Sequence, residues 1–226
     1  MKFDWYQATI PDHPLDVVQA VHSSLAPGGE VQEGRGQNGY RQTFTIRQQD
    51  GDRVAVVMCG GNNGAHPNAM ASGAVAHPFA SLVRELWPAH KVTRVDAAED
   101  MSEEGAYEAL EGVCRALAQE RGLKGRRILP DDPAEGRTYY IGSPASDVLT
   151  RLYDKTAETR RNLPPERHGE VPDHWVRIEA RVRPRKEAGY VAASLTPEQV
   201  WGCSAWTHEL ARRLFSLDLA RVEMQA

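Results

Sequence analysis

The sequence has little of what defines secreted, membrane-spanning or disordered proteins. Its 226 residues include only 3 cysteines, which are too few and too scattered for a disulfide framework or a zinc knuckle. No apolar run reaches the roughly 18 to 20 residues that cross a bilayer, and the first residues lack the apolar segment of a signal peptide. Charged residues make up 26% of the chain and are interleaved with apolar runs, which excludes a disordered chain. We expect a folded cytoplasmic protein that does not contact a membrane.

Motifs of several enzyme classes are also missing. No Gly-x-Ser-x-Gly segment occurs, which argues against a serine hydrolase. The glycine-rich residues 60–64 lack the Gly-Lys-Ser/Thr ending of a phosphate-binding loop, so we expect a turn or a DNA-contacting loop there. The histidines form no His-x-His or His-x-x-x-His pair that would predict a metal site.

The formal net charge of -4 conceals an uneven distribution. Residues 121–187 contain 15 lysines and arginines against 11 acidic residues, whereas the rest of the chain is strongly acidic. A local excess of positive charge on an acidic protein is expected when a single face meets phosphates. The second half of the chain is therefore the candidate region for nucleic-acid binding.

Strand-like and helix-like spacings of apolar residues occur in both halves and predict an α+β fold with a central, mainly antiparallel sheet. Residues 40–46 and 53–59 are β-rich and are joined across Asp50-Gly51, a strong hairpin signal. Trp175 to Val182 alternates strictly, so one sheet face is apolar and the other polar. The polar side carries Arg177, Glu179, Arg181 and Arg183.

Two helices are expected to cover one face of this sheet and to leave the other face open. Ser102 is the expected cap of a helix near 103–121, and the capping box Thr196 to Gln199 is expected to begin a helix near 197–215. The stretch 125–136 is an expected loop, and Leu219 to Met224 is β-like. We expect a single domain, residues 1–226, with two half-units near 1–124 and 125–226.

The segment from Leu149 to Lys155 contains the most reactive combination of side chains. If it is a strand, Arg151, Tyr153 and Lys155 share one face. Adjacent cations stabilise the phenolate of a tyrosine, and they can also hold the phosphate that the phenolate attacks. A tyrosine at the rim of the sheet beside surface charges is the alternative that the residues leave open.

Acidic residues on two predicted strands form a second candidate group. Asp96 and Asp100 share one face of the strand near 91–100, and Glu179 lies on the polar face of the later strand. Carboxylates on neighbouring strands can hold Mg²⁺ or Mn²⁺ through oxygen ligands. Structural pairing of these carboxylates with arginines is an equally favoured alternative.

Four segments in a fixed order carry a resemblance to a known family. They are Arg94-Val95-Asp96, then Gly136 to Ser146 (GRTYYIGSPAS), then Arg151-Leu152-Tyr153-Asp154-Lys155, then Trp175 to Glu179 (WVRIE). Together they resemble the replication initiation factor family, which comprises rolling-circle Rep proteins of plasmids and filamentous phages and relaxases of some integrative conjugative elements. The match runs from about residue 94 to residue 179, and the first 90 residues match only loosely.

The resemblance implies a DNA-nicking and strand-joining endonuclease. Tyr153 matches the nucleophile that forms a 5′ phosphotyrosine, leaves a free 3′ hydroxyl and later permits religation. Arg151 and Lys155 would neutralise charge on the phosphate. Asp96 and Glu179 match metal ligands for Mg²⁺ or Mn²⁺, and Asp100 is a third candidate.

The proposed reaction needs DNA contacts and partners. The expected DNA contacts are Arg137, Ser143, Arg177, Arg181 and Arg183. A solvated basic face is the alternative for the four arginines. The expected partners are origin DNA, single-stranded or extruded as a hairpin, the host replication helicase and polymerase, and a second copy of the chain in a homodimer.

The sequence departs from the family pattern in two respects, and it leaves two alternative functions open. Pro144 replaces the usual basic residue after Ser143, and the His-hydrophobic-His metal motif of other rolling-circle nucleases is absent. A conjugative relaxase would use the same tyrosine chemistry at a transfer origin. A non-catalytic DNA-binding module, with Tyr153 only stacking on a base, is the second alternative.

Overall fold

The computed structural model describes residues 1–62 and 64–222. Contacts within the chain divide it into two compact, discontinuous units. The N-terminal unit contains residues 3–96 and 183–195, and the C-terminal unit contains residues 1–2, 97–182 and 196–222. The half-units predicted near 1–124 and 125–226 differ from these units, because the chain passes from one unit to the other several times.

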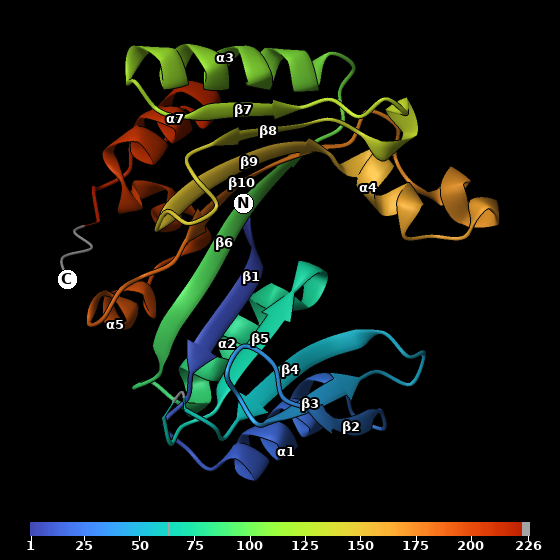
Figure 1. The fold of residues 1–226 in the computed structure, drawn as a ribbon, viewed down its shortest axis with the longest axis vertical. Helices are drawn as coiled ribbons and strands as arrows, with labels where there is room; N and C mark the ends of the chain where they lie inside the picture. Colours follow the sequence, from blue (N-terminus) through green and yellow to red (C-terminus); the bar gives the residue numbers. More distant parts are fainter. Residues whose placement is uncertain (63, 223–226) are drawn as a thin grey trace. The chain divides into compact units, whose positions relative to one another are not determined.

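The N-terminal unit is built on strands in the order β2-β3-β4-β5-β1-β6 (Figure 1). From β2 to β1 in this order, each strand pairs antiparallel with the next. The strands are β1 (Lys2–Thr9), β2 (Glu30–Arg35), β3 (Gln42–Arg47), β4 (Arg53–Cys59), β5 (Asn68–Ser72) and the first part of β6 (Lys91–Met101). The helical segments are α1 (Pro14–Leu25), η1 (Gly73–Val75), α2 (Ala76–Leu86) and α5 (Ala188–Ala192). The hairpin predicted at Asp50-Gly51 is confirmed, and Gly51 takes the positive φ of 89° that this turn uses.

The C-terminal unit contains the later part of β6 and then β10, β9, β8 and β7 in that order. The strands are β7 (Gly125–Ile128), β8 (Thr138–Ile141), β9 (Val148–Asp154) and β10 (Val176–Val182). The helical segments are α3 (Ala106–Glu120), η2 (Pro133–Glu135), α4 (Lys155–Arg161), η3 (Pro165–Glu170), α6 (Pro197–Val200), η4 (Trp201–Cys203) and α7 (Ala205–Phe215). The predicted α+β class with a mainly antiparallel sheet is confirmed.

Helix α3 covers the apolar side of this sheet, where it packs on β7, β8 and β9 and against α7 (Figure 1). Ile178 and Leu152 are fully buried in the core of the unit. The polar side of β10 is buried as well, since Arg177 is 4% exposed and Glu179 is 3% exposed. The prediction of an open polar face is therefore wrong at these two positions, because ion pairs allow the charges to be buried.

Several predicted boundaries are wrong for local reasons. The capping box of Thr196 and Gln199 is confirmed, but its helix ends at Val200 and a new helix begins after Ser204. Ser204 is extended and its side chain accepts a hydrogen bond from the Thr207 amide, so it caps α7. Helix α3 follows Gly105, whose φ is 79°, rather than Ser102.

Two other expectations concern segments without strong apolar periodicity. The loop expected over 125–136 contains β7 and η2. Residues 219–222 form no strand, and residues 223 and 224 of the predicted β-like stretch lie outside the described residues. Among the described residues, the helices are all too short or too polar to cross a membrane.

Candidate functional site

Strand β9 places Arg151 and Tyr153 on the same face at its C-terminal end. The guanidinium carbon of Arg151 lies 3.8 Å from the centre of the Tyr153 ring. The strand ends at Asp154, whose carboxylate accepts a hydrogen bond of 2.9 Å from the Ala157 amide and so caps α4. Lys155 is therefore the first residue of a helix rather than part of the predicted strand, and its Nζ lies 5.7 Å from the Tyr153 ring centre.

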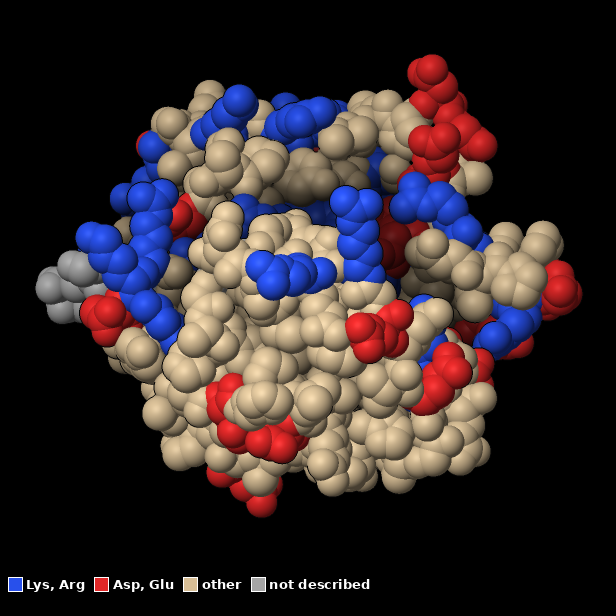
Figure 2. Space-filling model, turned by 60° about the horizontal axis from the view of Figure 1, so that its bottom comes forward, with Lys and Arg blue, Asp and Glu red and all other residues tan. Residues whose placement is uncertain are grey.

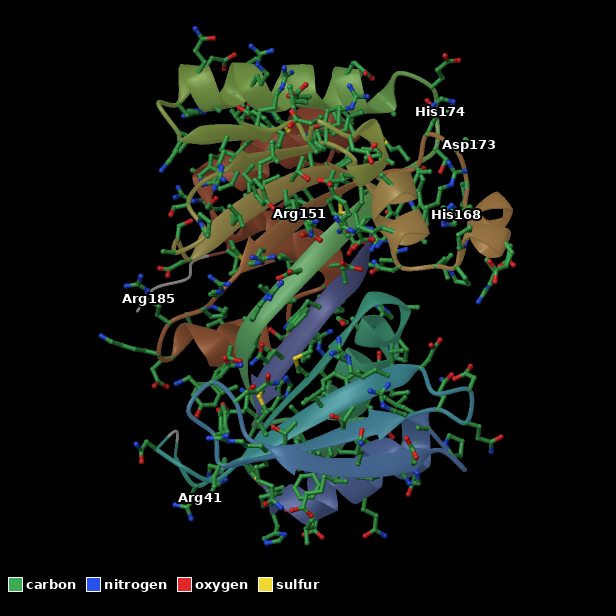
Figure 3. All side chains as sticks on the ribbon, turned by 45° about the vertical axis from the view of Figure 1, so that its right-hand side comes forward. Arg41, Arg151, His168, Asp173, His174 and Arg185 are labelled. Carbon is green, nitrogen blue, oxygen red and sulfur yellow. The ribbon has the colours of Figure 1, made fainter. Side chains whose placement is uncertain are left out.

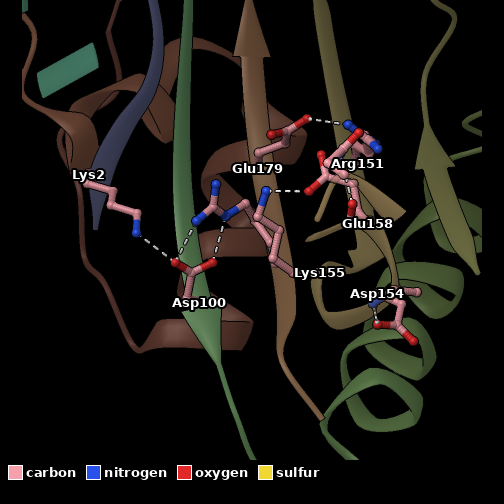
Figure 4. Close-up of polar contacts among 10 residues, drawn as sticks. Lys2, Asp100, Arg151, Asp154, Lys155, Glu158 and Glu179 are labelled. Carbon is pink, nitrogen blue, oxygen red and sulfur yellow. Dashed lines mark hydrogen bonds and ion pairs between the residues drawn. The ribbon is translucent and has the colours of Figure 1, made fainter. Parts of the chain in front are cut away.

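The Tyr153 side chain is 3% exposed and lies among cations. Pairing of β9 with β10 sets Arg151 opposite Glu179 and Tyr153 opposite Arg177. Arg151 Nη1 lies 3.7 Å from Glu179 Oε1, and Lys155 Nζ forms an ion pair with Glu158 (Figure 4). Both cations beside the tyrosine are therefore themselves balanced by carboxylates.

Arg177, a predicted DNA contact, forms an ion pair with Asp100. Its guanidinium donates to both carboxylate oxygens of Asp100, at 2.6 and 2.8 Å, and Lys2 adds a third contact at 2.7 Å (Figure 4). Burial alone would raise the pKa of Asp100, but hydrogen bonds and charge from Arg177 and Lys2 lower it to about 2. This carboxylate is therefore ionised at any physiological pH.

The proposed metal ligands do not fit a metal ion as they are arranged. Asp96 is buried, and both of its oxygens accept from the Arg94 guanidinium. Glu179 faces Arg151 and, at 4.0 Å, Arg181. Asp96 belongs to the N-terminal unit, whereas Glu179 and Asp100 belong to the C-terminal unit. Within the described residues no three His, Cys, Asp or Glu side chains form a group suited to a metal.

Tyr153 and Arg151 line a cavity of about 210 Å³ at the end of β9. Arg137 and Arg161 line the same cavity. Arg161 is exposed in the last turn of α4 and makes no ion pair with any described residue. Arg161 was not among the predicted site residues. The signal available in the sequence was a basic residue in the last turn of the helix that follows the Tyr153 strand.

A second cavity, of about 290 Å³, shares Arg137 and Asp154 with the first. Asp173 and His174 line it from the segment between η3 and β10, at the same side of the unit as His168 (Figure 3). His174 has a φ of 56°, a left-handed conformation that is uncommon for a residue with a side chain.

The other predicted DNA contacts are spread over the chain. Arg137 pairs with Glu108 at 2.6 Å and lies over the Tyr107 ring. Ser143 lies in the turn between β8 and β9, at the opposite end of β9 from Tyr153. Arg181 is on β10 beside Glu179, and Arg183 belongs to the N-terminal unit. Lysine and arginine side chains lie close to acidic ones at several places on the face in Figure 2.

The two units together form an α+β chain, with Tyr153 held on the paired strands β8, β9 and β10. A search against family models found no match, and no curated protein sequence matches the chain. A solved structure of a rolling circle replication initiator protein from Geobacillus stearothermophilus is similar, with a TM-score of 0.62 and 19% sequence identity. The alignment covers 88% of this chain and 82% of that one. The predicted resemblance to rolling-circle Rep proteins is confirmed at the level of the fold.

Proposed function

We propose that this protein initiates rolling-circle replication by nicking and rejoining one DNA strand at an origin, with Tyr153 as the nucleophile. The observation that carries the proposal is the position of Tyr153 under Arg151, in a cavity that Arg137 and Arg161 also line. The similar fold of a rolling circle replication initiator supports it. An arginine beside a tyrosine suits attack on a phosphodiester, since a cation stabilises both the phenolate and the phosphate.

The reaction is a transesterification on single-stranded or extruded DNA. The Tyr153 oxygen forms a bond to the scissile phosphorus, and the bond from phosphorus to the 3′ oxygen breaks. The phenol loses its proton and the 3′ oxygen gains one, which leaves a 5′ phosphotyrosine and a free 3′ hydroxyl. Because the phosphodiester is exchanged rather than hydrolysed, the reverse reaction rejoins the strand. The 3′ end would prime a host polymerase behind a host helicase.

Arg151 and Lys155 are the groups proposed to neutralise the phosphate. The Nε of Arg151 is buried without a hydrogen-bond partner among the described residues. It could therefore donate a hydrogen bond to a phosphate oxygen. A phosphate that binds Arg151 competes with Glu179 for the same guanidinium. Such competition would draw Arg151 off the Tyr153 ring and expose the hydroxyl to the DNA.

The test is an assay for a covalent adduct on a panel of labelled single-stranded and hairpin origin oligonucleotides. Wild-type protein should give a band that survives denaturation, and Tyr153→Phe should give none while it retains DNA binding. Tyr139→Phe is the matched control, since Tyr139 is a buried tyrosine on the neighbouring strand β8. A full-strength adduct with Tyr153→Phe would overturn the assignment. Reactions with Mg²⁺, Mn²⁺ or a chelator test the metal requirement predicted from the sequence.

A non-catalytic DNA-binding module is the second candidate, and the burial of Tyr153 favours it. Under this alternative Arg151 stays on the ring, and the protein binds DNA without cutting it. Binding without an adduct, on every oligonucleotide and with every metal, would support this alternative. A relaxase would instead give the adduct on transfer-origin sequences, so the panel includes both kinds of origin.

A further inference from the structure

The end of β7 exposes apolar side chains beside the Tyr153 cavity. Ile128 is 37% exposed and Leu129 is 59% exposed, and Pro130 follows them. We call Ile128, Leu129 and Pro130 the apolar shelf. Strand β7 lies at the edge of the sheet, and all of its residues are exposed. Exposed apolar residues that cluster beside a functional cavity usually mark a contact surface.

Strand pairing fixes the position of the shelf relative to Tyr153. Ile128 on β7 is opposite Thr138 on β8, and Thr138 is in turn opposite Tyr153 on β9. Residues directly opposite one another in a sheet share a face, so Ile128 and Tyr153 lie on the same face, two strands or about 10 Å apart. This spacing is within the reach of a single nucleotide.

Two cavities meet at the shelf. Ile128 and Pro130 line the cavity of about 210 Å³ that contains Tyr153 and Arg151. Leu129 and Pro130 line a neighbouring cavity of about 400 Å³, which shares Pro130, Gly136, Arg137 and Asp154 with the first. The second cavity has room for a nucleobase beside the place where the phosphate would bind.

The walls of the Tyr153 cavity differ in chemistry. The shelf forms an apolar wall, whereas Arg137, Arg151 and Arg161 supply positive charge. Of the carboxylates that line it, Glu158 pairs with Lys155 and Asp154 caps α4, while Glu135 also lies at the wall. An apolar wall next to cations matches the two ends of one nucleotide, a base and a phosphate. An apolar peptide would fill the apolar wall alone and would make no use of the arginines.

We propose that the apolar shelf holds an unpaired base of the nucleotide next to the scissile phosphate. The inference rests on the proposed function, and it names the wall of the site that would contact a base. Apolar side chains pack against bases that have left the stack. A base within a duplex is stacked on both faces and does not reach the shelf.

The experiment measures binding by the full-length Tyr153→Phe protein, so that the result does not depend on nicking. The probe is a fluorescent single-stranded oligothymidine, compared with the same oligonucleotide in which abasic residues replace the bases. The loss of a stacked base is expected to weaken binding about tenfold. Adding Leu129→Ser should remove most of this difference, and Ile128→Thr should reduce it.

Leu15→Ser is the matched control, because Leu15 is 55% exposed on α1 of the other unit. It should keep the full difference between intact and abasic probes. Circular dichroism and thermal unfolding should be equal for all variants. If Leu129→Ser keeps the full difference in affinity between intact and abasic probes, the shelf does not hold a base. A change in oligomeric state alone, measured by sedimentation, would also contradict this role. An adduct in the wild-type assay together with that result would leave the proposed function intact and remove only the shelf.

Discussion

The Arg151 guanidinium lies 3.8 Å from the centre of the Tyr153 ring and 3.7 Å, through Nη1, from Glu179 Oε1. One cation therefore covers the candidate nucleophile while a buried carboxylate on the neighbouring strand holds it there. Glu179 acts in this arrangement as a positioning residue for Arg151. DNA would have to exchange that carboxylate for a phosphate before the tyrosine could react.

Glu179→Gln should make Arg151 easier to displace. Binding of single-stranded DNA is expected to tighten about two- to fivefold, since a phosphate no longer competes with a carboxylate for the guanidinium. The free energy of unfolding should fall by about 1 kcal/mol, because a partly buried ion pair is lost. Fluorescence anisotropy and urea unfolding measure the two effects.

Glu170→Gln is the control for this substitution, because Glu170 pairs with Arg167 on an exposed surface. It should change neither quantity by more than the measurement error. A metal ligand at position 179 would behave differently. Glu179→Gln would then leave DNA binding unchanged and would weaken the dependence of adduct yield on Mn²⁺, which would contradict the positioning role.

Arg161→Gln should weaken DNA binding by removing a phosphate contact. Arg161 is exposed, lines the Tyr153 cavity and has no acidic partner among the described residues, so its charge is available to DNA. The slope of the logarithm of affinity against the logarithm of salt concentration should become shallower by about 0.7, the value for one contact to a single strand. Arg167→Gln serves as control, since Arg167 pairs with Glu170. Equal salt slopes for both variants would show that Arg161 does not contact a DNA phosphate.

Features of the sequence that are local in origin could be predicted. The Asp50-Gly51 hairpin and the Thr196 capping box depend on a few consecutive residues, and both are confirmed. Alternation in β9 also placed Arg151 and Tyr153 on one face, as the structure has them. These patterns are visible without knowledge of the rest of the fold.

Features that depend on distant partners could not be predicted. Strand β5 reads Asn-Ala-Met-Ala-Ser, a segment without β-branched residues, and it is a strand because it pairs with β1 and β4. Arg177 is buried because it meets Asp100, 77 residues earlier in the chain. Sequence alternation identified Arg177 as a polar position, but it carried no information about that carboxylate.

Ser204→Ala tests the unexpected break between η4 and α7. The Ser204 hydroxyl accepts a hydrogen bond from the Thr207 amide, and the loss of a helix cap costs about 1 kcal/mol. Thermal unfolding should therefore show a lower midpoint. Ser204→Asp should restore most of the stability, since aspartate is an equally good cap. Ser102→Ala is the control, since Ser102 is exposed and α3 follows Gly105 instead. Equal midpoints for Ser204→Ala and the wild type would contradict the role of this cap.

Asp100→Asn should destabilise the protein at neutral pH, and this loss of stability should become smaller as the pH falls. The pKa of Asp100 in the folded protein is about 2, below its ordinary value of 3.8, so the ionised carboxylate stabilises the fold above pH 4. This contribution, at most about 2 kcal/mol, should decline as the pH falls from about 4 to about 2 and the folded state takes up the proton. Urea unfolding of wild type and Asp100→Asn across this range should give a difference that is largest near neutral pH and shrinks at acid pH. Asp131→Asn, at an exposed loop position, should show no such trend. A difference between wild type and Asp100→Asn that stays constant from pH 7 to pH 2 would contradict the ion pair with Arg177.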